Sequence, residues 1–559
     1  MTAADVCAGG PDAGFGHTEA QRDAEVARLV RENEALAGRN AALMAENVAL
    51  REQVADLREQ VSVLSRLVFG RSSEKKRQAP ALDAEPDVAD GSGEGEAGQP
   101  QRRKRGQQPG SAGHGRRDYS HLETHEVVHD LDEADRTCKR CGTAYAPFGE
   151  ERCEQIDWRV TVVRVVHRRR SYRRACRCAV PALVCPPPPP KPIGKGRFTS
   201  QFLARLLVGK YVLGQPVHRI VAGLAHDGFD VAEGTLTGAL RAVSPLLAPL
   251  FQAICDRNVG AGHLHVDETS WKVFAAVPGK DGHRWWLWVF VAPDTTVFRL
   301  APTRSTKVLA EHLGIDVAAG ALEPGRQLLI SSDFFTVYQC LATVDGVDPL
   351  WCWAHVRRHF VRAGDAHKKT LAGWASDWVG RIGALYIAHR ALAAIDLADP
   401  QADTVAGQAQ AAFDTALATI DQVRRQQAAD PDLPAPARKV LDTLDREWDG
   451  LVRHQQHPRL PLDNNTAERA LRTPVVGRKN YHGSGSQWAA DLAGYAWSIT
   501  ATASRAGLNP QTYLTAYLNA CAANGAKPLH GQQLARFLPW TADPADLQAW
   551  QQATPARGP

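Results

Sequence analysis

The chain has 559 residues, 44% of them hydrophobic and 23% charged, and at this length roughly three or four structural units are expected rather than one core. The net charge of +5 is too small to identify a nucleic-acid partner, so the positions of the basic residues matter more than their number. No apolar run reaches bilayer length and residues 1–10 lack an export signal, so we expect a cytoplasmic protein without a membrane partner.

Residues 20–69 carry an unbroken heptad repeat. Leucine recurs at every seventh position from Leu29 to Leu64, and the residue three positions before each leucine is Val or Asn. This pattern is typical of a parallel coiled coil, in which seam asparagines pair across the interface and fix its register. The alternative is a single amphipathic helix packed on its own domain, which the regular Leu and Asn positions make less favoured. We therefore interpret residues 20–70 as a leucine zipper that forms a homodimer or a higher oligomer.

Residues 71–118 are predicted to be a disordered basic linker. Residues 79–100 are acidic and rich in Gly, Ala and Pro, and a tract rich in Arg and Gly follows. Such a tract can follow a phosphate backbone or enter a narrow minor groove. A solvated tail explains this segment equally well. The candidate DNA-binding residues here are Arg102, Arg103, Lys104, Arg105, Arg116 and Arg117.

Residues 119–192 have the features of a small zinc-ribbon-like DNA-binding module. Two closely spaced cysteine pairs flank a segment, 155–167, that alternates as strands do, and a hairpin there would bring four thiolates around a structural Zn²⁺. Unligated buried cysteines are the alternative. The candidate zinc ligands are Cys138, Cys141, Cys176 and Cys178, and Cys153 or Cys185 can replace one of them because the second pair has an unusual spacing. Nearby candidate phosphate contacts are Arg168, Arg169 and Arg170.

Residues 193–258 are predicted to be helical, after a stiff proline-rich spacer at 186–190. Residues 216–226 and 232–243, separated by a turn at Gly228, have the proportions of a helix-turn-helix. The second helix lacks an outward row of basic residues, however, so ordinary helical packing is the favoured interpretation.

Residues 259–361 predict a mixed α/β sheet. The expected strands are residues 263–273, 285–291, 296–300, 327–330 and 350–354, with a helix starting near residue 306.

Two aspartates lie within or at the end of strands of this sheet. Asp267 lies inside the first strand and Asp333 at the end of the fourth. Buried carboxylates on adjacent strands repel each other and are costly unless a cation compensates. Mg²⁺ or Mn²⁺ suits such oxygen ligands, and two ions can promote an in-line phosphoryl displacement.

A third carboxylate, Glu468, lies in the polar segment 463–472 (DNNTAERALR). Asn465 is a natural helix N-cap, so a capping-box role for Glu468 three residues later is a serious alternative to metal binding. The basic residues that follow favour a position beside DNA phosphates. They are Arg469, Arg472, Arg478 and Lys479.

Several short motifs occur along the chain in a specific order. They are residues 67–74 (LVFGRSSE), the basic tract 105–116, the cysteine pairs, 265–269 (HVDET), 352–358 (CWAHVRR), 463–469 (DNNTAER), 477–480 (GRKN) and 538–540 (LPW). Together they resemble the bacterial insertion-sequence transposases of the IS66 type, over about residues 20–545.

The resemblance implies a multidomain α/β protein with a DDE catalytic domain of RNase H-like fold. Its core would comprise residues 259–361 and a Glu-bearing helix in 461–507, with a helical insertion at 362–460 and a helical tail at 508–559. Carried over by position, the catalytic and Mg²⁺-binding triad is Asp267, Asp333 and Glu468. The resemblance also implies accessory proteins of the same element.

A second possible metal motif, Cys352-x2-His355-x3-His359, begins within the last predicted strand. The resemblance places it near the active site, with His355 and Arg358 closest, and we favour a structural or DNA-contacting role over a further zinc. The predicted function is a DNA transposase that cuts and joins the ends of an insertion element by two-metal phosphoryl transfer. The alternatives are a DNA-binding regulator with a non-catalytic domain and a hydrolytic nuclease of the same fold.

Overall fold

The computed structural model describes residues 183–276, 282–315, 320–395 and 402–551, with shorter stretches at 132–136, 138–146 and 160–173 and a few single positions. The chain divides into two units, Met1–Ala112 and Gly113–Pro559. Apart from helical Arg28, the predicted zipper and basic linker lie outside the described residues. The fold described below is that of the second unit.

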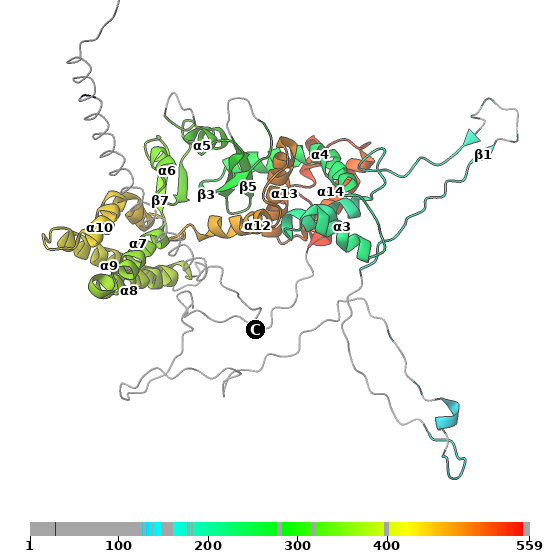
Figure 1. Cartoon of the computed structure of the whole chain (residues 1–559), viewed down its shortest axis with the longest axis horizontal. Helices are drawn as coiled ribbons and strands as arrows, with labels where there is room; N and C mark the ends of the chain where they lie inside the picture. The colour runs from blue at the N-terminus through cyan, green and yellow to red at the C-terminus, as the bar shows by residue number, and fades with distance from the viewer. Residues whose placement is uncertain are drawn as a thin grey trace, which may run out of the picture. The chain divides into compact units, whose positions relative to one another are not determined.

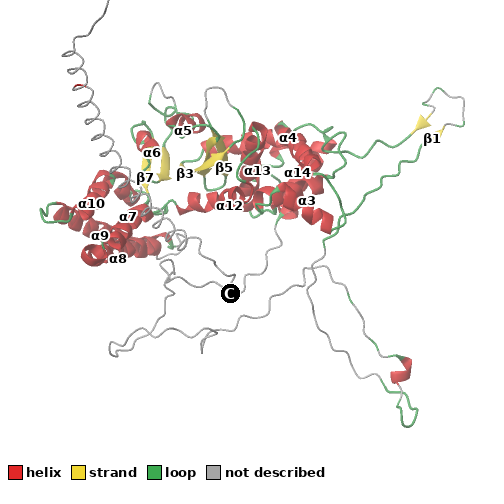
Figure 2. Cartoon of the chain, in the orientation of Figure 1, coloured by secondary structure: helices red, strands yellow, loops and turns green. Residues whose placement is uncertain are grey.

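A five-stranded mixed sheet forms the centre of this unit, with strand order β5-β4-β3-β6-β7. Strands β3, β4 and β5 are antiparallel, whereas β6 and β7 run parallel to β3. The strands are β3 (His263–Lys272), β4 (Arg284–Val291), β5 (Thr296–Ala301), β6 (Leu328–Ser332) and β7 (Val347–Trp351). The mixed sheet predicted from the sequence is therefore confirmed (Figure 2).

The last strand differs from its prediction. Strand β7 ends at Trp351, and the helix α7 (Trp353–Ala366) begins where the sequence indicated strand residues up to 354. Pro349 disfavours a strand in the sequence pattern. In the structure β7 is an edge strand, where a missing N–H is tolerated.

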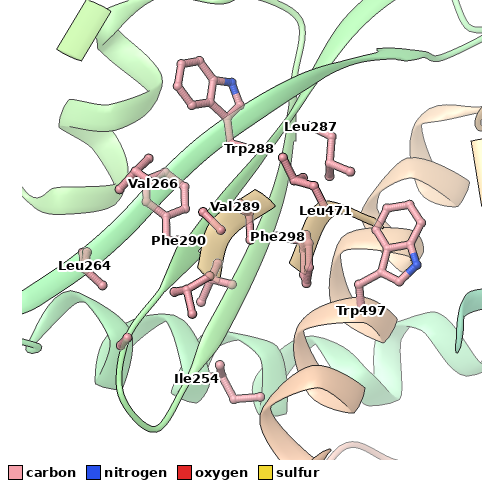
Figure 3. Packing of buried hydrophobic residues seen from close by; sticks show 14 of the residues in the cluster. Ile254, Leu264, Val266, Leu287, Trp288, Val289, Phe290, Phe298, Leu471 and Trp497 are labelled. Atoms are coloured by element: carbon pink, nitrogen blue, oxygen red, sulfur yellow. The ribbon is translucent and has the colours of Figure 1, made fainter. Parts of the chain in front are cut away.

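The sheet is buried on both faces. Strand β4 is almost entirely apolar, as expected for a strand with helices on both sides. On one face Trp288 packs edge-on against Tyr338 of α6 (Thr336–Leu341). On the other, Phe298 of β5 packs against Trp497 of α13 (Gln487–Arg505). Figure 3 shows this core around the strands, with Leu471 and Ile254 contributed by neighbouring helices.

The helices that precede the sheet include α2 (Ser200–Leu207), the π-helix η2 (Val208–Val212), α3 (Val217–His226) and α4 (Glu233–Val259). Helix α4 runs well beyond the predicted end at residue 243, through Pro245 and Pro249, because its apolar side is buried as far as Ile254. It thus acts as a core helix packed against α13 rather than as an exposed recognition helix.

Helix α4 also bears on the expectation that no segment reaches bilayer length. By length and composition alone α4 is long and apolar enough to cross a membrane. Half of its most apolar window is buried inside the protein, however, as in the core helix of a soluble domain. Helix α4 therefore carries little weight as evidence for a membrane span.

A group of helices separates β7 from the helix that carries Glu468. They are α7, α8 (Lys368–Ala393), α9 (Ala402–Ala428), α10 (Ala435–Arg446) and α11 (Trp448–Val452). Their core includes stacked Phe360 and Trp378, with Gln427 accepting hydrogen bonds from Trp374 and Trp378. His454 bonds the Trp351 carbonyl, which ties the group to β7 (Figure 1).

After this group the chain returns to the sheet through α12 (Asn465–Tyr481), which packs on β3 and β4. Helix α13 then covers β5, and α14 (Pro510–Ala523), α15 (Gly531–Ala535) and α16 (Pro544–Trp550) complete the described fold. Figure 1 shows α12 lying between the helical group and the helices around α4.

The predicted zinc module is described only in part. Residues 160–167 form no strand, and the short strands lie later, at β1 (Tyr172–Arg173) and β2 (Leu183–Val184). The strand prediction for 160–167 is therefore wrong, and Val163, Val165 and Val166 are exposed because no second layer covers them. Cys153, Cys176 and Cys178 lie outside the described residues.

Cys138 and Cys141 occupy a tight turn after the 3₁₀-helix η1 (Glu133–Arg136). The Gly142 amide donates to the Cys138 carbonyl. Backbone amides, first that of Arg140, lower the pKa of the Cys138 thiol to about 7. A thiol that ionises near neutral pH suits a metal ligand. Cys185 is a free, exposed cysteine.

Candidate active site

Asp267 lies in the middle of β3 and is largely removed from solvent. Its carboxylate accepts a hydrogen bond of 2.8 Å from the adjacent Glu268 amide. Burial first, and then the negative charges of Glu268, Asp333 and Glu468, raise its pKa to about 8. Asp267 is therefore within electrostatic reach of the other two predicted triad carboxylates.

Asp333 follows directly after β6, the parallel neighbour of β3. His265 pairs with Ser331 across these strands, so two residues further along each chain Asp267 and Asp333 come to the same end of the sheet. The Asp333 carboxylate accepts a hydrogen bond of 3.0 Å from the Phe335 amide, which orients it at the start of α6.

Glu468 lies in the first turns of α12 and does not serve as a capping-box residue. The N-cap is Asn464 rather than Asn465, and no side chain caps the helix. The Glu468 carboxylate instead reaches α7, where Arg358 donates to it at 2.6 Å and His355 Nε2 lies 3.7 Å away. The predicted cap at Asn465 is therefore wrong by one residue.

Asn464 explains this shift, because tertiary contacts fix its side chain. It is fully buried, and its Nδ2 donates at 2.8 Å to the Val266 carbonyl, one residue before Asp267. Its Oδ1 lies 3.2 Å from His265 Nδ1. The start of α12 is thus bonded directly to β3, which holds Glu468 close to the two aspartates.

Cys352 also helps to hold the start of α12 in place. Its sulfur accepts a hydrogen bond of 3.2 Å from the Asn464 amide, and the next residue, Trp353, donates to the Leu462 carbonyl. Burial raises the pKa of Cys352 to about 12, which keeps the thiol neutral. Cys352 therefore links the start of α7 to the start of α12.

His355 and Arg358 lie on α7 against Glu468. Arg358 also donates to His355 Nε2 at 3.2 Å, so one guanidinium contacts both side chains. Burial, followed by the charge of Arg358, lowers the pKa of His355 and favours the neutral imidazole. Both residues thus lie beside Glu468, the third predicted carboxylate.

Glu268 is a functional candidate that the sequence interpretation missed. It is buried on the opposite face of β3 from Asp267. Arg304 and the Tyr338 hydroxyl both hydrogen-bond to its carboxylate, and the Arg304 guanidinium lies over the Phe335 ring, 3.4 Å from its centre. The sequence feature that could have identified Glu268 is its position next to Asp267, in a strand whose two faces are both buried.

The predicted DNA-contacting residues differ in their surroundings. Arg469 and Arg472 are exposed on α12. Arg478 contacts the protein itself, donating to the Thr269 hydroxyl at 3.1 Å and to the Ser270 carbonyl. Among Arg168, Arg169 and Arg170, all exposed, Arg169 also bonds the Pro186 carbonyl. The basic residues at 102–105 and 116–117 lie outside the described residues.

The donor set at the three carboxylates fits a divalent cation chemically. Within the described part of the chain no three His, Cys, Asp or Glu side chains already converge as an ion site, and the Glu468 carboxylate is paired with Arg358. Asp267, however, is a desolvated carboxylate among like charges, with no cationic side chain bonded to it in the same part of the chain. A hard cation bound there would offset both the cost of burying the Asp267 charge and its repulsion from the neighbouring carboxylates.

Comparisons with known proteins agree with the motifs. The family model described as Transposase IS66 family matches residues 195–492, just over half of the chain, and one described as Transposase C of IS166 homeodomain matches residues 56–113. Similar proteins from Sinorhizobium fredii include the uncharacterized protein y4hP, 24% identical over 73% of this chain and 74% of its own length. The uncharacterized protein y4jD is 25% identical over 75% of this chain and 80% of its own. No solved structure matches.

Proposed function

Since the chain belongs to the IS66 family of transposases, we propose that it cuts DNA at the ends of an insertion element and joins those ends to target DNA, with Asp267, Asp333 and Glu468 as catalytic carboxylates. The observation that carries this proposal is that Asp267 and Asp333 lie at the same end of the sheet, while the start of α12, which bears Glu468, is hydrogen-bonded to β3 beside Asp267. The strand order β5-β4-β3-β6-β7 supports an RNase H-like catalytic domain into which α8–α11 are inserted.

Asp267, Asp333 and Glu468 would hold two Mg²⁺ or Mn²⁺ ions. When bound, such ions activate the attacking oxygen and stabilise the leaving one in phosphoryl transfer. Asp267 must then be ionised, although burial and its neighbours hold a proton on it near neutral pH. Glu468 must give up its ion pair with Arg358. The released guanidinium can then bind a DNA phosphate beside the site.

The remaining parts of the chain would bind and arrange the DNA. Exposed Arg469 and Arg472 extend from the catalytic carboxylates along α12 and are placed for phosphate contact. We also propose that residues 20–69 dimerise the protein, which would act in the bacterial cytoplasm at the nucleoid, with accessory proteins of the same element. A structural Zn²⁺ bound by Cys138, Cys141, Cys176 and Cys178 would order the DNA-binding module.

The test is strand cleavage of DNA carrying the element's ends, in the presence of Mg²⁺ or Mn²⁺. Asp267→Asn, Asp333→Asn and Glu468→Gln keep the side-chain shapes and remove the charges. Each is expected to lower cleavage by roughly 10²-fold or more. Asp345→Asn is the matched control, because Asp345 is an exposed carboxylate in the turn before β7, and its activity should equal the wild type.

Two outcomes would overturn the proposal. A wild-type protein that binds the ends but shows no metal-dependent cleavage is a DNA-binding regulator. A protein that cleaves but gives no strand-transfer products from pre-cut ends is a hydrolytic nuclease.

A further inference from the structure

A basic hollow of about 470 Å³ lies where the end of β3 and the start of β4 meet the C-terminal turn of α12. Its lining includes three residues with a permanent positive charge, two histidines and no acidic residue. The lining residues are Ser270, Trp271, Lys272, Phe274, His283, Arg284, Arg478 and His482. The hollow therefore has the charge of an anion-binding site.

Two of these cations face each other, and neither is paired with a carboxylate in the part of the chain that the structure describes. Lys272 and Arg284 are directly paired across the antiparallel ladder of β3 and β4. Both are exposed, and neither forms an ion pair with any described carboxylate. Like charges at directly opposed positions destabilise a sheet. A bound anion would relieve that repulsion.

The walls of the hollow are fixed by hydrogen bonds. Arg478 is held by Thr269 and Ser270 through one guanidinium nitrogen, Nη1. The turn that follows α12 is bonded to the strand end, with the Ser484 amide donating to the Lys272 carbonyl and the Phe274 amide to the Ser484 carbonyl. His482, in this turn, has a left-handed backbone with φ of 65°. The cations are thus presented on an ordered surface.

The hollow lies at a definite distance from the catalytic carboxylates. Lys272 is five residues beyond Asp267 on β3, or about 17 Å at the usual rise of a strand, and lies on the opposite face of that strand. Arg478 is ten residues beyond Glu468 on α12, or about 15 Å along a helix. A DNA strand carries one phosphate per nucleotide, so a distance of this size corresponds to a few nucleotides along one strand.

We propose that the hollow binds a backbone phosphate of the DNA a few nucleotides from the phosphate that is cut, and so sets the position of the strand in the active site. The proposal rests on the proposed function. Exposed Arg469 and Arg472 lie between Glu468 and Arg478 in the sequence of α12. The ligand is recognised by charge and not by base sequence.

The first test measures DNA binding by the full chain as a function of salt. The double variant Lys272→Gln/Arg284→Gln removes the opposed cations, and Lys439→Gln/Lys527→Gln is a matched control at exposed lysines on α10 and after α14. Loss of one phosphate contact should lower the slope of log K against log salt by about 0.9. The control should keep the wild-type slope. An unchanged slope in the hollow variant overturns the proposal.

The second test locates the contact. Ethylation of single phosphates on the element's end removes one charge at a time. We expect interference at one phosphate a few nucleotides from the cut for the wild type and none there for the hollow variant. Interference at the same phosphate in both proteins overturns the proposal. Thermal melting checks folding, and relief of the Lys272–Arg284 repulsion should leave the variant at least as stable as the wild type.

Two further measurements separate this proposal from related ones. If inorganic phosphate stabilises the wild type but not the hollow variant while both have the same DNA salt slope, the hollow binds a free phosphate, and the DNA assignment is wrong. Cleavage by Asp267→Asn is scored separately. A salt-slope loss in a protein that never cleaves DNA supports the hollow and contradicts only the enzymatic proposal.

Discussion

Helix α12 meets β3 at both of its ends, and the two meeting points differ in burial and in the sign of their charges. At the N-terminal end, buried Asn464 bonds the Val266 carbonyl, and the charges gathered there are the carboxylates of Asp267 and Glu468. At the C-terminal end, Arg478 bonds Thr269 and Ser270 beside exposed cations.

The difference shows how one helix can hold two kinds of site. Buried carboxylates require a compensating cation and fixed side-chain positions, since each carboxylate raises the cost of ionising the next. Positive charge on the surface is solvated and needs only to be near an anion. We therefore expect changes at the carboxylate end to have large effects and changes at the basic end to have small ones.

The largest effect is expected for Asn464→Ala. The substitution leaves the buried Val266 carbonyl without its donor and frees the start of α12, so Glu468 loses its placement. We expect a loss of stability of about 2–3 kcal/mol and of DNA cleavage by roughly 10²-fold. Chemical denaturation and the cleavage assay measure the two effects.

The matched control is Asn509→Ala, which removes the N-cap of α14 through its bonds to Gln511 and Thr512. It should cost about 1 kcal/mol and leave cleavage unchanged. Equal losses of cleavage in the two variants would show that Asn464 acts through general stability and not by positioning Glu468.

The next effect is a pH dependence that arises from Asp267. Folding raises its pKa from the ordinary 3.8 to about 8, so the folded protein retains a proton that the unfolded chain releases. Without divalent ions, stability relative to Asp267→Asn should be constant below pH 4 and fall as pH rises toward 8. Melting of both proteins across this range measures the difference.

Mg²⁺ provides the control for this prediction. At alkaline pH the ion should stabilise the wild type, whose Asp267 is then ionised, and have little effect on Asp267→Asn. A stability difference that does not change with pH would mean that Asp267 is ionised in the folded protein without a metal, and the enclosed-charge description of this end would be wrong.

A smaller effect is expected for Arg358→Gln. Arg358 competes with a metal for the Glu468 carboxylate, but their ion pair is partly exposed and hence weak. The variant should bind Mn²⁺ roughly two- to fivefold more tightly, as measured by calorimetry, because the competing cation is gone. Arg362→Gln, further along α7, is the control and should leave the affinity unchanged. Weaker binding by Arg358→Gln would show that the ion pair positions Glu468 for the metal.

The sheet and the places of the two aspartates could be predicted from the sequence, because local patterns determine them. Residues 285–291 are apolar at nearly every position, which only a strand buried on both faces explains. Asp267 interrupts such a strand and Asp333 ends one, and both lie where the pattern placed them.

The details around Glu468 could not be predicted, because they depend on contacts between distant segments. The helix cap falls on Asn464 since its side chain bonds β3, about two hundred residues earlier in the chain. The pairing of Glu468 with Arg358 and the burial of Glu268 beside Arg304 also join separate elements. Local spacing alone allowed a capping box at Asn465, which the structure contradicts.

The smallest effect is expected for Arg478→Gln at the basic end of α12. Its bonds to Thr269 and Ser270 are formed near the surface, where water replaces a lost partner at little cost. We expect a loss of less than about 1 kcal/mol in chemical denaturation, well below that of Asn464→Ala. A loss as large as that of Asn464→Ala would mean that the basic end of α12 contributes as much as the other end to holding the helix on β3. The two ends of α12 would then differ in charge but not in how strongly they are attached to β3.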